Sequence, residues 1–172
     1  MGVTYTTAAG ATYIPIASYT VSGTSTTSYN FSSITSAYTD LILIIQGSAS
    51  AADNVYLRFN SDSTTNYSCT GLFGNGTSAT SSSRTSFNAA LIFDGGFSTT
   101  QATSISHIMN YANTTTYKTV LTRNSDTATY ASAEVCLWRA TPAAISTVTV
   151  GLYSGAYFVS GTTFSLYGIL GA

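Results

Sequence analysis

Short apolar runs with a two-residue alternation recur along this chain, and this pattern limits the folds available to it. In Asn54–Asn60, the residues Val55, Leu57 and Phe59 share one face of an extended segment, while polar residues lie between them. Ser146–Tyr153 alternates in the same way. Such alternation is typical of half-buried antiparallel strands, and the helical spacing of apolar residues is nearly absent. We therefore expect an all-β protein with little or no helix.

Turn-forming residues separate these runs at short intervals, as in a sandwich or barrel. The expected strands are Ala17–Val21, Tyr29–Ile34, Leu41–Gly47, Asn54–Asn60, Asn66–Phe73, Ser86–Phe93, Thr103–Tyr111, Tyr117–Arg123, Ala131–Arg139, Ser146–Tyr153 and Thr163–Leu170. The polar segment Thr77–Thr85 is interpreted as a long exposed loop. The fold class that we expect is a jelly-roll-like antiparallel β-sandwich.

Composition decides between a folded and a disordered chain. Charged residues make up 6% of the chain, and Ser and Thr together about a third. Disordered chains are poor in aromatic and β-branched residues, but this one has 13 Tyr and 8 Phe. Its 172 residues suffice for one domain with a core. We expect a single sandwich domain over 17–172, preceded by an N-terminal arm or edge strand over 1–16.

Two runs are apolar on both faces of the expected strand. They are Leu41–Ile45 and Val135–Trp138. A strand in a sandwich buries one face in the core, so the second face must contact a loop or another subunit. The sparse charge on this chain favours assembly, since a net charge near zero promotes association.

The charges are too few and too scattered for several functions. The five basic residues are not clustered, which argues against nucleic-acid binding. Met1–Tyr5 lacks a basic start and no long apolar run follows, so we expect neither a secretory signal nor a membrane span. Cys136 lies between apolar residues and is interpreted as a small core residue, with a Cys69–Cys136 bridge as the alternative.

The chain has few residues that could serve in catalysis or bind a metal ion. The single histidine, His107, is interpreted as a residue of the core edge or an interface, because no acyl-transfer motif accompanies it. Asp53 and Asp62 lie in consecutive expected loops, where the alternatives are calcium binding and turn closure; we favour turn closure. Glu134 is the one acidic residue within an expected strand. We expect no enzyme activity, no metal and no cofactor.

Several stretches resemble small structural proteins of tailed bacteriophages, among them capsid decoration (cement) proteins and tail or head fibre proteins. The resemblance lies in Tyr29–Ile34, Tyr38–Leu43, Tyr56–Asp62, Asn66-Tyr67 and Gly161–Ile169. It implies a β-sandwich in a virion, on the outer surface of the capsid. It also implies the major capsid protein as partner and a homotrimer as the assembly. The alternative is a tail or head fibre domain that recognises a host surface glycan.

The same segments and the N-terminal segment suggest roles for individual residues. Arg58 is expected to pair with Asp40 or Asp62, and Phe164 and Leu166 to fill the core. Gly168 would permit a close approach of another segment. The residues expected to contact a partner are apolar residues of the N-terminal segment, namely Tyr5, Tyr13, Ile14, Pro15 and Ile16.

Overall fold

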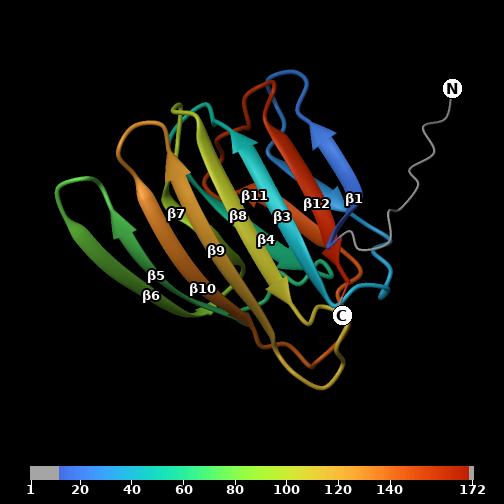
Figure 1. Cartoon of the computed structure of the whole chain (residues 1–172). Helices are drawn as coiled ribbons and strands as arrows, with labels where there is room; N and C mark the ends of the chain where they lie inside the picture. The colour runs from blue at the N-terminus through green and yellow to red at the C-terminus, as the bar shows by residue number, and fades with distance from the viewer. Residues whose placement is uncertain (1–11, 171–172) are drawn as a thin grey trace, which may run out of the picture.

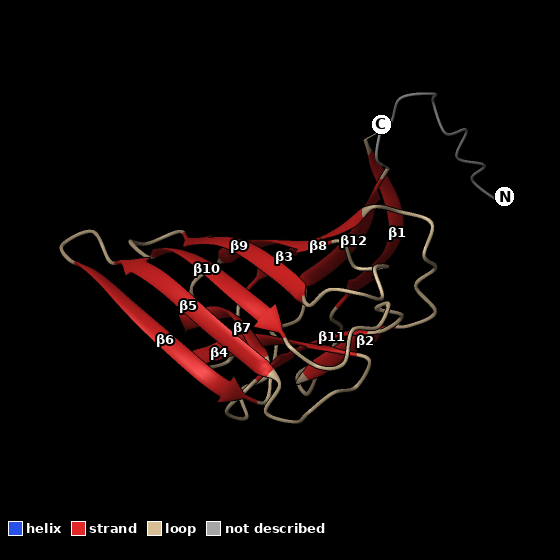
Figure 2. Cartoon of the chain, turned by 90° about the horizontal axis from the view of Figure 1, so that it is seen from below, coloured by secondary structure: helices blue, strands red, loops and turns tan. Residues whose placement is uncertain are grey.

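The chain folds into two antiparallel sheets that lie face to face. Figure 1 shows the computed structural model, which describes residues 12–170. Every element in this part of the chain is a strand, so the expectation of an all-β antiparallel sandwich is confirmed. Figure 2 shows the larger sheet curving over the smaller one, with loops closing the ends of the layers.

The larger sheet has eight strands in the order β1-β12-β3-β8-β9-β10-β5-β6. Its strands are β1 (Tyr13–Thr20), β3 (Asp40–Gly47), β5 (Tyr67–Gly74), β6 (Ala79–Phe87), β8 (Ala102–Met109), β9 (Lys118–Asp126), β10 (Ala131–Trp138) and β12 (Thr163–Ile169). The smaller sheet has the order β2-β11-β4-β7. Its strands are β2 (Ser28–Phe31), β4 (Asp53–Phe59), β7 (Ala90–Phe97) and β11 (Val148–Leu152).

The core lies between the inner faces of the two sheets. Phe164 and Leu166 of β12 are fully buried there, as expected, and so is Leu57 of β4. Phe158 makes edge-on contacts with both Phe97 and Phe164, which links the two sheets through an aromatic cluster. Each such side chain contributes about 1.5–3 kcal/mol by leaving water, so this layer is the main source of stability.

Gly168 has the close approach that the sequence suggested. A Cβ atom at this position would lie 2.2 Å from the ring of Tyr38. The absence of a side chain on Gly168 therefore lets the Tyr38 ring pack directly on the last strand.

The segment expected to be a loop at Thr77–Thr85 is instead most of strand β6. This strand pairs with β5 at the edge of the larger sheet, and most of its side chains are exposed. An edge strand far from the core needs little apolar surface, so its Ser- and Thr-rich sequence resembles that of a loop. The loop interpretation was wrong for this reason.

The first strand begins before the boundary drawn from the sequence. β1 covers Tyr13–Thr20, so the division between residues 16 and 17 falls inside one strand. β1 pairs with β12 and forms the other edge of the larger sheet. Tyr13–Ile16 are thus part of an edge strand within the sandwich.

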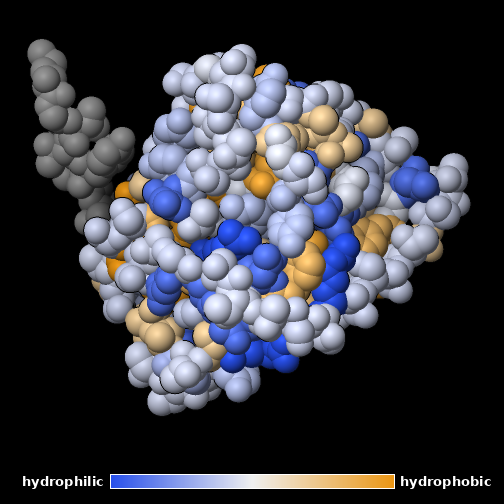
Figure 3. Space-filling view, turned by 180° about the vertical axis from the view of Figure 1, so that it is seen from behind, coloured by the Kyte–Doolittle hydropathy of each residue, from blue (hydrophilic) through white to orange (hydrophobic). Residues whose placement is uncertain are grey.

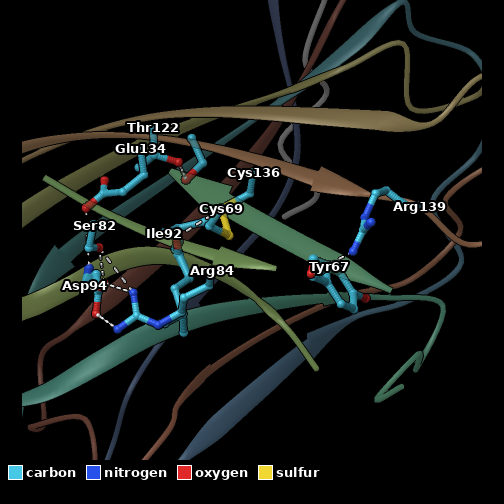
Figure 4. Close-up of a disulfide and its surroundings, with 12 residues drawn as sticks. Tyr67, Cys69, Ser82, Arg84, Ile92, Asp94, Thr122, Glu134, Cys136 and Arg139 are labelled. Atoms are coloured by element: carbon cyan, nitrogen blue, oxygen red, sulfur yellow. Dashed lines mark hydrogen bonds and ion pairs between the residues drawn. A yellow bond between two sulfur atoms is a disulfide. The ribbon is translucent and has the colours of Figure 1, made fainter. Parts of the chain in front are cut away.

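Cys69 and Cys136 form a disulfide, so the interpretation of Cys136 as an unpaired core residue was wrong. The two residues are direct partners in the antiparallel pair of β5 and β10, as Figure 4 shows. The bond joins positions 67 residues apart in sequence. It anchors the β5–β6 hairpin to the rest of the larger sheet.

Candidate functional site

The outer face of the larger sheet carries a row of mostly apolar side chains across its central strands. Tyr167, Ile42, His107, Leu121 and Val135 are successive partners from β12 to β10. Side chains alternate along a strand, so the inward positions of these strands fill the core while these residues point outward. The two-faced runs at Leu41–Ile45 and Val135–Trp138 are the source of this row.

Several of these outward side chains are well exposed. The exposed fraction is 41% for Leu121, 46% for Val135 and 64% for Leu72, which lies on neighbouring strand β5. Figure 3 shows the opposite side of the molecule, over the smaller sheet, where pale and blue residues surround scattered orange ones. On the larger sheet, by contrast, five consecutive strands (β3, β8, β9, β10 and β5) have aliphatic residues on the outer face, with Ile105 as the one on β8.

A groove of about 480 Å³ lies on this outer face. It is lined by Tyr13, Ile42, Ile105, His107, Leu121, Thr122, Arg123, Ala133, Glu134, Val135 and Ile169. We call it the outer-face groove. Its volume falls within the range of about 300–1,000 Å³ that is usual for binding pockets, and its lining is mostly aliphatic, as such pockets require.

His107 and Asp40 contact each other in and beside this groove, whereas Arg123 stands apart from them. His107 Nε2 lies 2.8 Å from Asp40 Oδ2, and the other oxygen of Asp40 accepts a hydrogen bond of 2.6 Å from the backbone N–H of Asn110. Arg123 is exposed, and within residues 12–170 it makes no ion pair or side-chain hydrogen bond. The groove therefore offers one unpaired guanidinium.

The residues expected to contact a partner border this groove and a second one. Tyr13 is 54% exposed and makes an edge-on contact with Tyr167, with ring centroids 6.3 Å apart. Ile14, Pro15 and Ile16 line the second groove, of about 540 Å³, at the β1 edge. Tyr5 lies outside the described residues. The sequence did not indicate that Ile42, Leu121 and Arg123 would join Tyr13 in one groove, because strand order brings them together.

Glu134 lines the outer-face groove, but its carboxylate belongs to a polar cluster between the sheets. Its carboxylate accepts hydrogen bonds from the Asn124 side chain at 2.5 Å and from the Asp94 backbone N–H at 3.4 Å. Asp94 forms an ion pair with Arg84, as Figure 4 shows. Burial raises the pKa of Glu134 to about 7, because the charged form loses water. With 2% of its surface exposed, Glu134 serves to hold β10 against β7.

Asp53 and Asp62 close turns through their own carboxylates. Asp53 accepts hydrogen bonds from the backbone N–H groups of Ser154 and Ala156, at 2.9 and 3.1 Å. Asp62 accepts from Thr64 at 2.9 Å and from the indole of Trp138 at 2.7 Å. Within residues 12–170 there is no group of three His, Cys, Asp or Glu residues that could hold a metal ion.

Arg58 does not pair with either acidic residue that the sequence suggested. Its Nε donates to the carbonyl of Asn88 at 3.0 Å, and its guanidinium lies over the ring of Tyr56, 4.7 Å from the centroid. Asp40 faces His107 instead, and Asp62 faces Trp138. The expected pairing was wrong because Arg58 belongs to the smaller sheet, where it contacts Tyr56 of its own strand and Asn88 of the turn before β7.

Comparison with known proteins adds little to this description. No protein-family model matches the chain, and no curated protein matches its sequence. A solved structure, the marine PL-14 alginate lyase from Aplysia kurodai, is similar over 81% of this chain and 72% of its own, with a TM-score of 0.31 and 8% identity. Within the described part of the chain, no helix is long and apolar enough to cross a membrane.

Proposed function

We propose that this protein is a structural component of a bacteriophage particle, a decoration protein that binds the outer surface of the capsid and stabilises it. Its partners are the major capsid protein and two further copies of itself in a homotrimer, and it performs no catalysis. The observation that carries this proposal is the aliphatic outer face of the larger sheet. The resemblance of Tyr29–Ile34, Tyr56–Asp62 and Gly161–Ile169 to phage structural proteins supplies the context.

The outer face is large enough for a stable contact. Eight strands at a spacing of about 4.8 Å and strands of eight residues at about 3.4 Å per residue cover roughly 900 Å². A stable protein interface buries about 800 Å² on each partner. Burial of apolar surface stabilises by about 25 cal/mol per Å², so the aliphatic part of this face, on β3, β8, β9, β10 and β5, supplies the driving force for attachment.

Charge contributes less to attachment than area does, because the chain has only five basic and six acidic residues and a net charge of −1. Asp40, Asp53, Asp62, Asp94, Asp126 and Glu134 all accept hydrogen bonds from other groups of the chain. Long-range electrostatic steering needs charges that remain available on the surface. Attachment is therefore passive and rests mainly on area and shape.

The competing function is a fibre domain that binds a host glycan. Sugar rings stack on aromatic faces, but the floor of the outer-face groove is formed by Ile42, Ile105, Leu121 and Val135. Tyr13 is the one aromatic residue in the lining of this groove, and the aliphatic floor forms no such stacking surface. This feature favours capsid decoration over glycan recognition.

The experiment compares particles that carry the protein with particles from which its gene has been deleted. Gold-labelled antibody should mark the head, and purified protein should rebind to deleted heads and remain bound in 1 M salt. Apolar burial does not weaken as the Debye length falls to about 3 Å. Label on the tail alone would show the fibre function, and release by salt would contradict attachment by area.

A pair of variants then tests which face binds. Val135→Asn places an amide in the apolar row and should weaken rebinding to heads. Val159→Asn is the matched control, because Val159 is similarly exposed (37%) but lies outside the larger sheet, in the segment before β12. Equal rebinding of the two variants would exclude this face as the contact.

A further inference from the structure

Arg123 occupies an unusual position on the outer face. In the row of side chains next to the one already described, its neighbours are Ile105 on β8 and Ala133 on β10. Ile44 and Leu72 continue this row on either side. The guanidinium is therefore surrounded by aliphatic side chains. The four neighbouring strands, β3, β8, β10 and β5, place no acidic residue in its row.

The other charged groups near the groove cannot neutralise Arg123. The carboxylate of Asp40 is engaged by His107 and by the Asn110 backbone. Glu134 contributes to the groove lining, but its carboxylate accepts hydrogen bonds from Asn124 and from the Asp94 backbone, between the sheets. A partner that covers the groove would bury Arg123 without a counter-ion unless it brought one. Burying an unpaired charge is costly, so a compatible partner must supply an acidic group.

We propose that the outer-face groove binds an extended peptide segment of the capsid protein, with an Asp or Glu side chain paired to Arg123 and apolar side chains on both sides of it. This inference rests on the proposed function and names the chemistry of its contact. The planar guanidinium matches a carboxylate through two parallel hydrogen bonds. The aliphatic side chains of Ile42, Ile105, Leu121 and Val135 receive the flanking apolar residues.

The shape of the groove favours an extended segment over a compact ligand. Its lining runs from Tyr13 on β1 to Val135 on β10, across six consecutive strands of the sheet order. Six strands at about 4.8 Å span roughly 24 Å, the length of about seven residues of extended chain. One anionic residue within such a segment reaches Arg123, while the apolar neighbours lie over the aliphatic floor.

The first experiment measures rebinding to deleted heads with variants of the arginine. Arg123→Gln should weaken binding at least about tenfold, since a charge desolvated in an interface loses its partner's compensation. The affinity of Arg123→Lys should lie between those of the wild type and Arg123→Gln, because lysine keeps the charge but lacks the planar guanidinium. Arg58→Gln is the control, because it removes the same charge from the smaller sheet. Thermal melts should show all three variants folded.

The second experiment uses a defined probe and does not depend on the particle. Two seven-residue peptides of alternating Val and Thr are titrated into the isotope-labelled protein, one with a central Asp and the other with a central Asn. The Asp peptide should shift the methyl signals of Leu121 and Val135 at several-fold lower concentration than the Asn peptide. The Arg123→Gln variant should abolish this difference.

The outcomes separate the two proposals. If the wild-type protein rebinds to heads but Arg123→Gln binds equally well, the acidic partner is excluded and capsid decoration stands. If the protein fails to bind heads, decoration is excluded, and the peptide titration alone decides the chemistry of the groove. Equal shifts from the Asp and Asn peptides, or shifts confined to the smaller sheet, would overturn the inference.

Discussion

The disulfide between Cys69 and Cys136 is expected to supply a large share of the stability of this protein. The perturbation is reduction of the bond, which leaves every residue in place and therefore changes the packing little. The bond closes a loop of 67 residues. In the chain-entropy treatment, a loop of this length restricts the unfolded chain enough to stabilise the native state by about 4 kcal/mol at 25 °C. For a chain of this size, the corresponding fall in melting temperature is roughly 8–16 °C.

The assay is equilibrium unfolding in urea, followed by tyrosine and tryptophan fluorescence, with and without a phosphine reductant. The free energy of unfolding should be lower by about 4 kcal/mol in the reduced protein. The double variant Cys69→Ala with Cys136→Ala is the control, because the reductant should leave its unfolding curve unchanged. A thiol assay should find no reactive thiol in the oxidised native protein.

Two results would refute this reasoning. Detection of two free thiols in the oxidised protein would show that the bond is not formed. A difference below about 1 kcal/mol between the oxidised and reduced forms would show that the unfolded chain is not restricted as calculated. In that case the β5–β6 hairpin would owe its position to strand pairing alone.

Three further changes test individual contacts. The pKa of Glu134 is raised to about 7, so the folded state binds its proton more tightly than the unfolded state does. The free energy of unfolding should therefore fall by a few kcal/mol as pH rises from about 4.5 to 7. Glu134→Gln should remove this pH dependence in urea titrations. Gly168→Ala should cost about 1–3 kcal/mol through the clash with Tyr38, whereas Gly74→Ala, which meets only atoms at 3.9 Å, should be nearly neutral in thermal melts. Partial burial raises the pKa of Asp62, but hydrogen bonds to its carboxylate outweigh this and lower it to about 2, so Asp62→Ala should destabilise the protein at pH 7 and much less at pH 2.

Much of the fold could be predicted from short stretches of sequence. The alternation in Asn54–Asn60 and Ser146–Tyr153 places Leu57 and Val150 in the core, where both are fully buried. The run Leu41–Ile45 was expected to need a second contact face, and its outward residue Ile42 lies on the floor of the outer-face groove. These predictions hold because a strand's two faces follow from the order of adjacent residues.

The errors share one physical origin, which is that an isolated segment does not reveal its neighbours. The β6 segment is polar because it lies at an edge, and its own residues do not distinguish an edge strand from a loop. Arg58 was expected to pair with Asp40 or Asp62, which lie in neighbouring stretches of the sequence. Its hydrogen-bond partner is Asn88, 30 positions further along the chain.

The candidate groove shows the same division between local and long-range information. The sequence alone determined that the chain forms strands, which side chains share a face, and that few charges remain for a binding surface. Only the tertiary structure decided that Tyr13, Ile42, Leu121 and Arg123 line one groove and that Cys69 meets Cys136. Side-chain alternation is a property of neighbouring residues in one strand. Contacts between residues far apart in sequence depend on strand order and register, which are set by the packing of the whole core.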